Sequence, residues 1–224
     1  MNGKKPTVAI TVVSSNTNLL VPCLETLFQN PPGNCDFKVY ATWNGPGRGL
    51  ARMPDYLPQQ FPAVEFTESF TSGFPFNQNR MVERIDADYY LLANDDLLFL
   101  PGSVENAVAF LERPENARVG NLGIKLLNAD STLQPSTYSF PGLPRAILAI
   151  SGLRGLIPLN AGLFKLAKFV GIGDGKSRYW DHDRTVDVDS YRGSYMLVRG
   201  TALKEVGLLD VNGGEETESH MRFH

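Results

Sequence analysis

The sequence lacks the features that mark several common protein classes. It has only two cysteines, Cys23 and Cys35, among 224 residues, and their spacing does not suit a metal site. Free thiols in an intracellular protein are the simplest interpretation. The apolar segment near the N-terminus is short and is interrupted by Ser14 to Asn16. We therefore expect neither a signal peptide nor a membrane-spanning segment.

The sequence also has no long run of basic residues. Its net charge is -3 at neutral pH, which argues against a nucleic-acid partner. Hydrophobic residues make up 42% of the chain and charged residues 20%, a composition typical of globular proteins. The length is sufficient for one domain with a large core.

What the sequence does have is an apolar run, Tyr89 to Gly102, that is interrupted by Asn94, Asp95 and Asp96. The residues before the interruption have the length and bulk of a strand buried on both faces. Two adjacent carboxylates repel each other and resist desolvation, so we expect them at the end of that strand. A divalent cation with a phosphate ligand would relieve this repulsion. An acidic turn between a strand and a helix is the alternative.

Strand-like and helix-like segments alternate through the first half in the order β-α-β-β-α-β-α-β. This order predicts a mainly parallel sheet with helices on its faces. Ligands of such sheets bind at the carboxyl ends of the strands. Three polar breaks, at residues 14–16, 43–44 and 94–96, follow predicted strands and should therefore converge. The predicted strands are 7–13, 37–42, 64–67, 89–93 and 119–127, and the predicted helices lie near 19–28, 81–85 and 101–111.

The second half of the sequence is less regular. Residues 141–170 are apolar and rich in Gly and Pro, which favours core-packing helices, with a lid or contact with a membrane or lipid-linked substrate as alternatives. We expect a strand over 186–198, interrupted near 192–194, and a helix over 201–206. His182, between two aspartates, is interpreted as a solvated loop residue. Trp180 is a candidate platform on which a sugar could stack.

Several stretches, taken in order, resemble family 2 glycosyltransferases and, within them, a rhamnosyltransferase-like branch. The resemblance covers nearly the whole chain. It implies one α/β domain of the GT-A fold over residues 1–224, with a nucleotide-sugar-binding half at 1–128 and an acceptor-side half at 129–224. The matching stretches are V-V-S-S-N-T-N-L-L-V-P-C-L-E-T-L, G-F-P-F-N-Q-N, Y-Y-L-L-A-N-D-D-L-L-F-L-P-G, V-G-N-L-G-I-K-L-L-N-A-D-S-T-L-Q-P-S and V-D-S-Y-R-G-S-Y-M-L-V-R.

The resemblance implies a role for each matching residue. Asp96 would bind the metal, Mg²⁺ or Mn²⁺, and Asp95 would lie beside it at the donor phosphates and ribose. Glu216, or its neighbour Glu215, would be the catalytic base. The residues implied to face the donor sugar and acceptor are Gly193 and Ser194. The other residues implied to bind the donor are Ser14, Ser15, Asn16, Asn44, Asn79 and Asn94.

The implied activity is inverting, metal-dependent transfer of a sugar, with rhamnose favoured by the branch resemblance. The donor would be a dTDP- or UDP-sugar and the acceptor a glycan or lipid-linked molecule of cell-surface polysaccharide synthesis. A cation held by carboxylates can neutralise the departing diphosphate, and a second carboxylate can take the proton of the acceptor hydroxyl. We expect the protein in the cytoplasm, with peripheral contact at the inner face of the membrane.

Trp43 marks a departure from the family, which usually has Asp at this position. A noncatalytic module that binds a nucleotide-sugar or a glycan is therefore the alternative function. A nucleotide-sugar pyrophosphorylase is disfavoured, because no Gly-rich phosphate loop with a basic residue follows the first predicted strand.

Overall fold

The computed structural model describes residues 4–44, 52–69, 73–138 and 182–211. The chain divides into two compact units. Residues 1–124 and 193–224 form the first unit, and residues 125–192 form the second, which is inserted into the first. Among the described residues, no helix is long and apolar enough to span a membrane.

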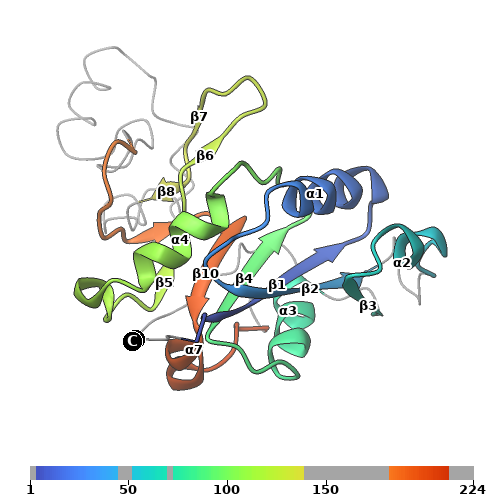
Figure 1. Cartoon of the computed structure of the whole chain (residues 1–224), viewed down its shortest axis with the longest axis horizontal. Coiled ribbons are helices and arrows are strands. Elements are labelled where there is room, and N and C mark those ends of the chain that lie inside the picture. Colours follow the sequence, from blue (N-terminus) through green and yellow to red (C-terminus); the bar gives the residue numbers. More distant parts are fainter. Residues whose placement is uncertain (1–3, 45–51, 70–72, 139–181, 212–224) are drawn as a thin grey trace, which may run out of the picture. The chain divides into compact units, whose positions relative to one another are not determined.

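A six-stranded sheet forms the centre of the first unit, with the order β3-β2-β1-β4-β10-β5 (Figure 1). β1 pairs in parallel with both β2 and β4, and β2 pairs in parallel with β3. Only β10 runs antiparallel, against β4 and β5. The strands are β1 (Thr7–Ser14), β2 (Asp36–Trp43), β3 (Val64–Glu68), β4 (Tyr89–Asn94), β5 (Asn121–Leu122) and β10 (Tyr195–Arg199). The sheet is thus mainly parallel, as predicted.

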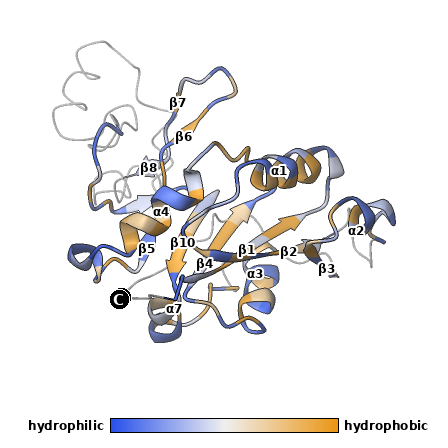
Figure 2. Cartoon of the chain, viewed as in Figure 1, coloured by the Kyte–Doolittle hydropathy of each residue, from blue (hydrophilic) through white to orange (hydrophobic). Residues whose placement is uncertain are grey.

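Helices cover both faces of this sheet. Figure 1 shows α1 (Thr17–Gln29) and α4 (Ser103–Leu111) on one face, with α3 (Phe74–Val82) and α7 (Gly200–Val206) on the other. Because both faces are covered, the central strands are mostly hydrophobic (Figure 2). Ile10, Val12 and Leu91 are completely buried.

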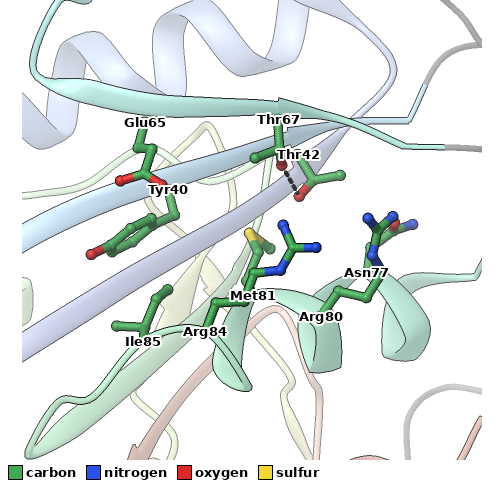
Figure 3. A pocket seen from close by; sticks show the side chains of 9 residues that line it. All are labelled: Tyr40, Thr42, Glu65, Thr67, Asn77, Arg80, Met81, Arg84 and Ile85. Atoms are coloured by element: carbon green, nitrogen blue, oxygen red, sulfur yellow. Dashed lines mark hydrogen bonds between the residues drawn. The ribbon is translucent and has the colours of Figure 1, made fainter.

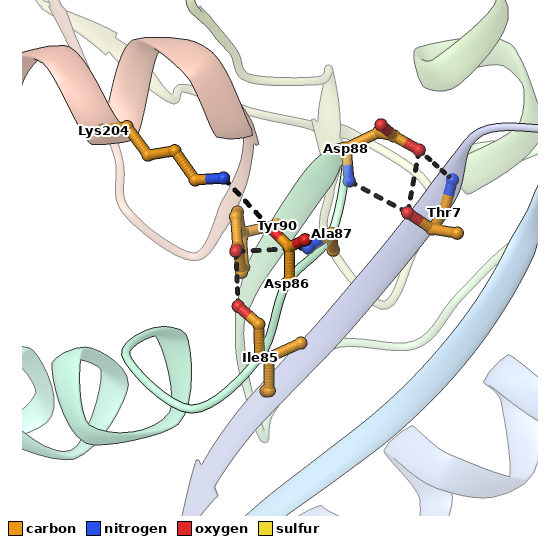
Figure 4. Close-up of polar contacts among 7 residues, drawn as sticks. All are labelled: Thr7, Ile85, Asp86, Ala87, Asp88, Tyr90 and Lys204. Carbon is orange, nitrogen blue, oxygen red and sulfur yellow. Dashed lines mark hydrogen bonds and ion pairs between the residues drawn. The ribbon is translucent and has the colours of Figure 1, made fainter.

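The amino edge of the sheet is held by a hydrogen-bonded network (Figure 4). Asp88 Oδ2 accepts hydrogen bonds from the backbone N–H and the hydroxyl of Thr7, both at 2.8 Å. The Asp88 N–H donates in return to Thr7 Oγ1 at 3.0 Å. The Tyr90 hydroxyl donates to the Ile85 carbonyl at 2.6 Å. These bonds join the start of β1 to the start of β4.

Gly200 lies at the same edge, where β10 ends and α7 begins. Its N–H donates to the Asp88 carbonyl at 2.8 Å. A Cβ atom at this position would lie 2.5 Å from the Ala87 carbonyl oxygen, so only glycine allows this approach.

The structure confirms the strands predicted through residue 111 and the helices predicted near 19–28 and 101–111, and it adds the short helix α2 (Tyr56–Gln60). The helix predicted near 81–85 begins earlier, at Phe74, and ends at Val82. The predicted strand over 119–127 is wrong as a single element. β5 ends at Leu122, and β6 (Leu126–Leu127) instead pairs with β7 (Leu133–Gln134) in the second unit. The break follows from the boundary between the two units after Ile124.

The strand predicted over 186–198 also divides, at its expected interruption. β9 (Ser190–Tyr191) pairs with β8 (Thr137–Tyr138) in the second unit, whereas β10 joins the main sheet. The helix predicted over 201–206 is confirmed as α7. The apolar segment 141–170 lies outside the described residues.

Candidate functional site

Polar residues from three strand ends meet at the carboxyl edge of the sheet. The Ser14 hydroxyl, at the end of β1, donates to Asp95 Oδ2 at 2.5 Å, just after β4. The Asn44 N–H, just after β2, donates to the Ser14 carbonyl at 2.7 Å. The predicted convergence of the three polar breaks is therefore confirmed.

The turn between β1 and α1 is fixed by its own polar groups. The Asn16 N–H donates to Ser14 Oγ at 3.1 Å. Asn16 is also the N-cap of α1, because its side-chain oxygen accepts the Asn18 N–H at 2.9 Å. Ser15 and Asn16 are exposed at this edge. The cap fixes the start of α1 beside the acidic pair.

Asp95 and Asp96 differ in their surroundings. Asp95 is partly buried, and this burial raises the pKa of its carboxyl; the charge of Asp96 raises it further, while the Ser14 hydroxyl opposes the shift. Asp96 is exposed, and its side chain has no hydrogen bond or ion pair with any residue in the described part of the chain. Folding therefore leaves negative charge here without a positive partner among the described residues.

Cys23 lies under this acidic pair. Its Sγ is 3.8 Å from the Asn94 carbonyl oxygen, which accepts from the thiol. Burial raises the pKa of Cys23 to about 12, with the charges of Asp95 and Asp96 adding to the effect. The thiol is therefore protonated at neutral pH and packs as a small apolar group.

The start of β10 brings Ser194 to the same edge. The Asn94 N–H donates to the Ser194 carbonyl at 3.0 Å, and Asn94 Nδ2 lies 3.5 Å from Ser194 Oγ. Gly193 directly precedes this contact. Hydrogen bonds thus link Ser14 to Asn44 and Asp95, and Asn94 to Ser194, while the chain itself joins Asn94, Asp95 and Asp96.

Asn79 makes different contacts. Its Nδ2 donates to the Leu209 carbonyl at 2.8 Å, and its Oδ1 accepts the Leu209 N–H at 2.9 Å. Both ends of the amide thus hold the segment after α7 against α3. Its proposed role at the donor stays a prediction.

The neighbouring Gln78 joins α3 to the centre of the sheet. It is fully buried, and its Oε1 accepts from the Thr11 hydroxyl at 2.5 Å. The sequence alone did not identify Gln78 as a structural residue. The one indication of its role is that it is a polar residue on the apolar side of a helix.

Three predicted site residues, Trp180, Glu215 and Glu216, lie outside the described residues. Trp43, where the resembled family has Asp, is only 5% exposed and belongs to the core. His182 lies in a loop, as predicted, and is partly exposed, but its ring is not free of the protein. Its Nε2 lies 3.1 Å from the hydroxyl of the buried Ser136, within the second unit.

The acidic pair can be tested as a metal site from its own chemistry. Carboxylate and hydroxyl oxygens are suitable ligands for Mg²⁺ and Mn²⁺. Within the described ranges, no group of three or more His, Cys, Asp or Glu residues could hold a metal. Mg²⁺ is commonly held by one or two carboxylates together with substrate phosphates and water. Asp96 with Asp95 therefore fits a cation that arrives with a phosphorylated ligand.

Neither a protein-family model nor a curated protein matches the sequence. Solved structures do match the fold. The mannosyltransferase PcManGT from Pyrobaculum calidifontis, in complex with GDP-Man and Mn²⁺, has a TM-score of 0.55 and 15% identity over 93% of this chain and 49% of its own. TarS 1-349 from S. aureus has a TM-score of 0.53 and 11% identity, over 92% of this chain and 51% of its own.

The chain therefore spans about half the length of these two structures. At such low identities the likeness establishes the fold alone. It confirms the predicted α/β architecture of GT-A type with a mainly parallel central sheet.

Proposed function

We propose that this chain carries the nucleotide-sugar-binding and catalytic part of a glycosyltransferase. The observation that carries the proposal is the acidic pair Asp95–Asp96 at the carboxyl edge of a GT-A-type sheet, with Asp95 bonded to Ser14 from the adjacent strand. Ligands of parallel sheets bind at this edge.

In this proposal the acidic pair holds the cation that accompanies the donor diphosphate. Asp96 is the exposed ligand, and Asp95 is held in place by the Ser14 hydroxyl. A bound Mg²⁺ or Mn²⁺ would stabilise the charge of the departing diphosphate. Cation binding would also favour the ionised form of Asp95, which burial disfavours in the free protein.

The Ser194 hydroxyl and the Asn94 amide adjoin the acidic pair, where the sugar and its acceptor would meet. Transfer with inversion needs a base that takes the proton of the acceptor hydroxyl from the opposite side of the sugar. We assign this role to Glu216 or Glu215 on the family resemblance.

The nature of the donor is also proposed. The mannosyltransferase with a similar fold was solved with GDP-Man and Mn²⁺, which supports a nucleotide-diphospho-sugar and a divalent cation. The resemblance to a rhamnosyltransferase-like branch favours a dTDP- or UDP-linked deoxysugar, and a glycan or lipid-linked acceptor. Such acceptors agree with a cytoplasmic protein in peripheral contact with the membrane.

A thermal-shift screen tests the proposal directly. The full chain is heated with GDP-Man, UDP-GlcNAc, UDP-glucose and dTDP-rhamnose, each with and without Mn²⁺. A ligand at a hundred times its Kd stabilises the native state by about 2.7 kcal/mol, so a true donor raises Tm measurably. We expect this rise to require Mn²⁺ and to disappear in Asp96→Asn. The proposal fails if no nucleotide-sugar raises Tm in the presence of Mn²⁺.

The second candidate is a noncatalytic module of the same fold. It is favoured by Trp43, which is buried where the resembled family has an Asp that contacts the nucleoside. Calorimetry with the donor found in the screen, alongside a donor-hydrolysis assay, separates the two candidates. Binding without turnover on any acceptor supports the module.

A further inference from the structure

A polar pocket lies on the α3 face of the sheet, where β2 and β3 pass over α3 (Figure 3). Its volume is about 120 Å³. None of its lining residues belongs to the carboxyl-edge group formed by Ser14, Asn44, Asn94, Asp95, Asp96 and Ser194. The residues that line it are Tyr40, Thr42, Glu65, Thr67, Asn77, Arg80, Met81, Arg84 and Ile85.

Two arginines give one end of this pocket a concentrated positive charge. Figure 3 shows Arg80 and Arg84 extending from the α3 side toward the two threonines above them. They are four residues apart, a spacing at which like charges on a helical segment repel. Neither guanidinium forms an ion pair with any residue that the structure describes. The positive charge at this end is therefore not balanced within the described part of the chain.

Arg80 is held in a defined position. It donates to the buried Ser69 hydroxyl at 3.1 Å, and its guanidinium lies 5.9 Å from the centre of the Phe76 ring. Arg84 is exposed, and its side chain forms no hydrogen bond with the described residues. One arginine is thus fixed and the other can adjust to a ligand.

The threonine pair supplies a further donor. Thr42 Oγ1 and Thr67 Oγ1 lie 3.1 Å apart, and Thr42 is only 4% exposed. Each hydroxyl has one hydrogen, and their mutual bond uses only one of the two. The remaining hydroxyl hydrogen can be donated to an acceptor in the pocket. The pair therefore supplies one neutral donor in addition to the two guanidinium groups.

The opposite end of the pocket has the opposite character. Figure 3 shows Tyr40 and Glu65 together, away from the arginines. Burial raises the pKa of Tyr40, and the charge of Glu65 raises it further. Tyr40 is therefore a neutral phenol at neutral pH. This end suits a hydroxyl or amino group, whereas the other end suits an oxyanion.

We propose that this pocket binds an oxyanion group, phosphoryl or carboxylate, of a small polar molecule, at a site separate from the acidic edge. Arg80 and Arg84 would hold the anionic oxygens, as paired guanidinium groups do for phosphate and carboxylate. The free hydroxyl hydrogen of the Thr42–Thr67 pair would add one more bond. Thr42 belongs to β2, and β2 is followed directly by Asn44, whose N–H donates to the Ser14 carbonyl at the acidic edge. The pocket and the acidic edge are therefore connected through β2. The inference is independent of the function proposed above.

Titration calorimetry of the full chain tests this inference. Inorganic phosphate and malonate are titrated separately at constant ionic strength without divalent cations, so that the two oxyanion classes are distinguished. At least one of them should bind to the unaltered chain. Arg84→Gln should weaken that binding about tenfold or more, because a charge-assisted hydrogen bond is lost. Thr67→Val, which keeps the charge, should weaken it by a smaller factor.

Two control variants make the result specific. Arg113→Gln removes an equally exposed arginine on the α4 side, which lies over Phe110 at 5.9 Å, and should leave the Kd unchanged. Asp96→Asn alters the acidic edge and should not weaken anion binding. The inference is overturned if neither anion binds, if Arg84→Gln binds as tightly as the unaltered chain, or if Arg113→Gln weakens binding equally. Circular dichroism confirms that each variant is folded.

Discussion

Aspartates at the two edges of the central sheet have pKa values shifted in opposite directions. Asp88 lies just before β4 and Asp95 just after it. The hydrogen bonds from the Thr7 N–H and hydroxyl lower the pKa of Asp88, whereas burial raises the pKa of Asp95. The ionised form of Asp88 therefore stabilises the folded state, whereas the ionised form of Asp95 destabilises it.

This difference separates an aspartate that stabilises the fold from the aspartates that we propose to bind a ligand. At the amino edge, the charged oxygen of Asp88 has donors from the neighbouring strand. At the carboxyl edge, Asp95 receives a bond from Ser14, while Asp96 beside it adds a second negative charge. Folding leaves this negative charge without a positive partner among the described residues. Parallel sheets bind ligands at this edge, and such charges are typical of functional sites.

The largest expected effect comes from the carboxyl edge. Asp96→Asn should reduce donor turnover in the presence of Mn²⁺ by at least about a hundredfold, because the cation of the proposed site would lose its exposed ligand. The fold should be retained, since Asp96 is exposed. Initial rates with the donor from the thermal-shift screen measure the effect.

Asp88→Ala is the matched control for this experiment, because it removes an aspartate from the opposite edge of the same strand. Its turnover should remain within a few-fold of the unaltered chain at a temperature where both are folded. Equal losses in the two variants would contradict the division of roles between the edges.

The second prediction concerns stability. Asp88→Ala should lower the free energy of unfolding by about 1 kcal/mol, because two hydrogen bonds to a carboxylate are lost at an exposed site where solvent screens them. Urea unfolding measures this loss. Asp88 has a lowered pKa, so its contribution is present above the unfolded-state value of about 3.9 and is lost as pH falls through the lower native value.

The difference between Asp88→Ala and the unaltered chain should accordingly be constant near neutral pH and shrink below about pH 4. A difference that persists unchanged at pH 2 would show that the carboxylate charge is not the source of the stability.

Much of the fold could be predicted from the sequence because its signals are local. The β-branched residues of Thr7 to Val13, and the apolar run ended by Asn94, identify two adjacent strands. Alternation with helices then makes the sheet parallel and brings the strand ends together. The contact between Ser14 and Asp95 follows from that topology.

The remaining features depend on contacts between distant residues. The family resemblance implies a donor-side role for Asn79, but it gives no sign that the Asn79 amide is bonded to Leu209, a partner 130 residues away. His182 likewise meets Ser136 from another part of the chain. Two-residue strands such as β6 and β9 are too short for any periodicity to be visible. The catalytic base, Glu216 or Glu215, lies outside the described residues and stays a prediction.

A third and smaller effect is expected from Asp95→Asn. The side-chain oxygen of Asn can still accept from Ser14, while the half-buried charge beside Asp96 is removed. The variant should therefore have a higher Tm than the unaltered chain in the absence of Mn²⁺. Because the native pKa of Asp95 is raised, the ionised form carries the penalty, so the gain should be largest at neutral pH and vanish as Asp95 becomes protonated.

Scanning calorimetry at pH 7 and pH 4 measures this dependence. Adding Mn²⁺ with the donor should reverse the order of the two Tm values, because only the carboxylate attracts the cation. A lower Tm for Asp95→Asn without Mn²⁺ would show that the carboxylate stabilises the free protein, as it does at Asp88.

The smallest effect is expected from the ion pair at the amino edge, between Lys204 of α7 and Asp86. Its nitrogen and oxygen are 3.0 Å apart, but the two side chains are 70% and 90% exposed (Figure 4). The hydrogen bond and charge of Asp86 raise the pKa of Lys204, so any stabilisation is fully present at neutral pH and is lost only in strong alkali. Solvent screens such a pair, and the entropy lost in ordering the long lysine side chain offsets its attraction. Lys204→Gln should therefore leave the Tm at pH 7 unchanged within error, in low and high salt. A clear, salt-sensitive loss of stability would mean that charge pairing, and not the Thr7–Asp88 hydrogen bonds alone, holds this edge of the sheet.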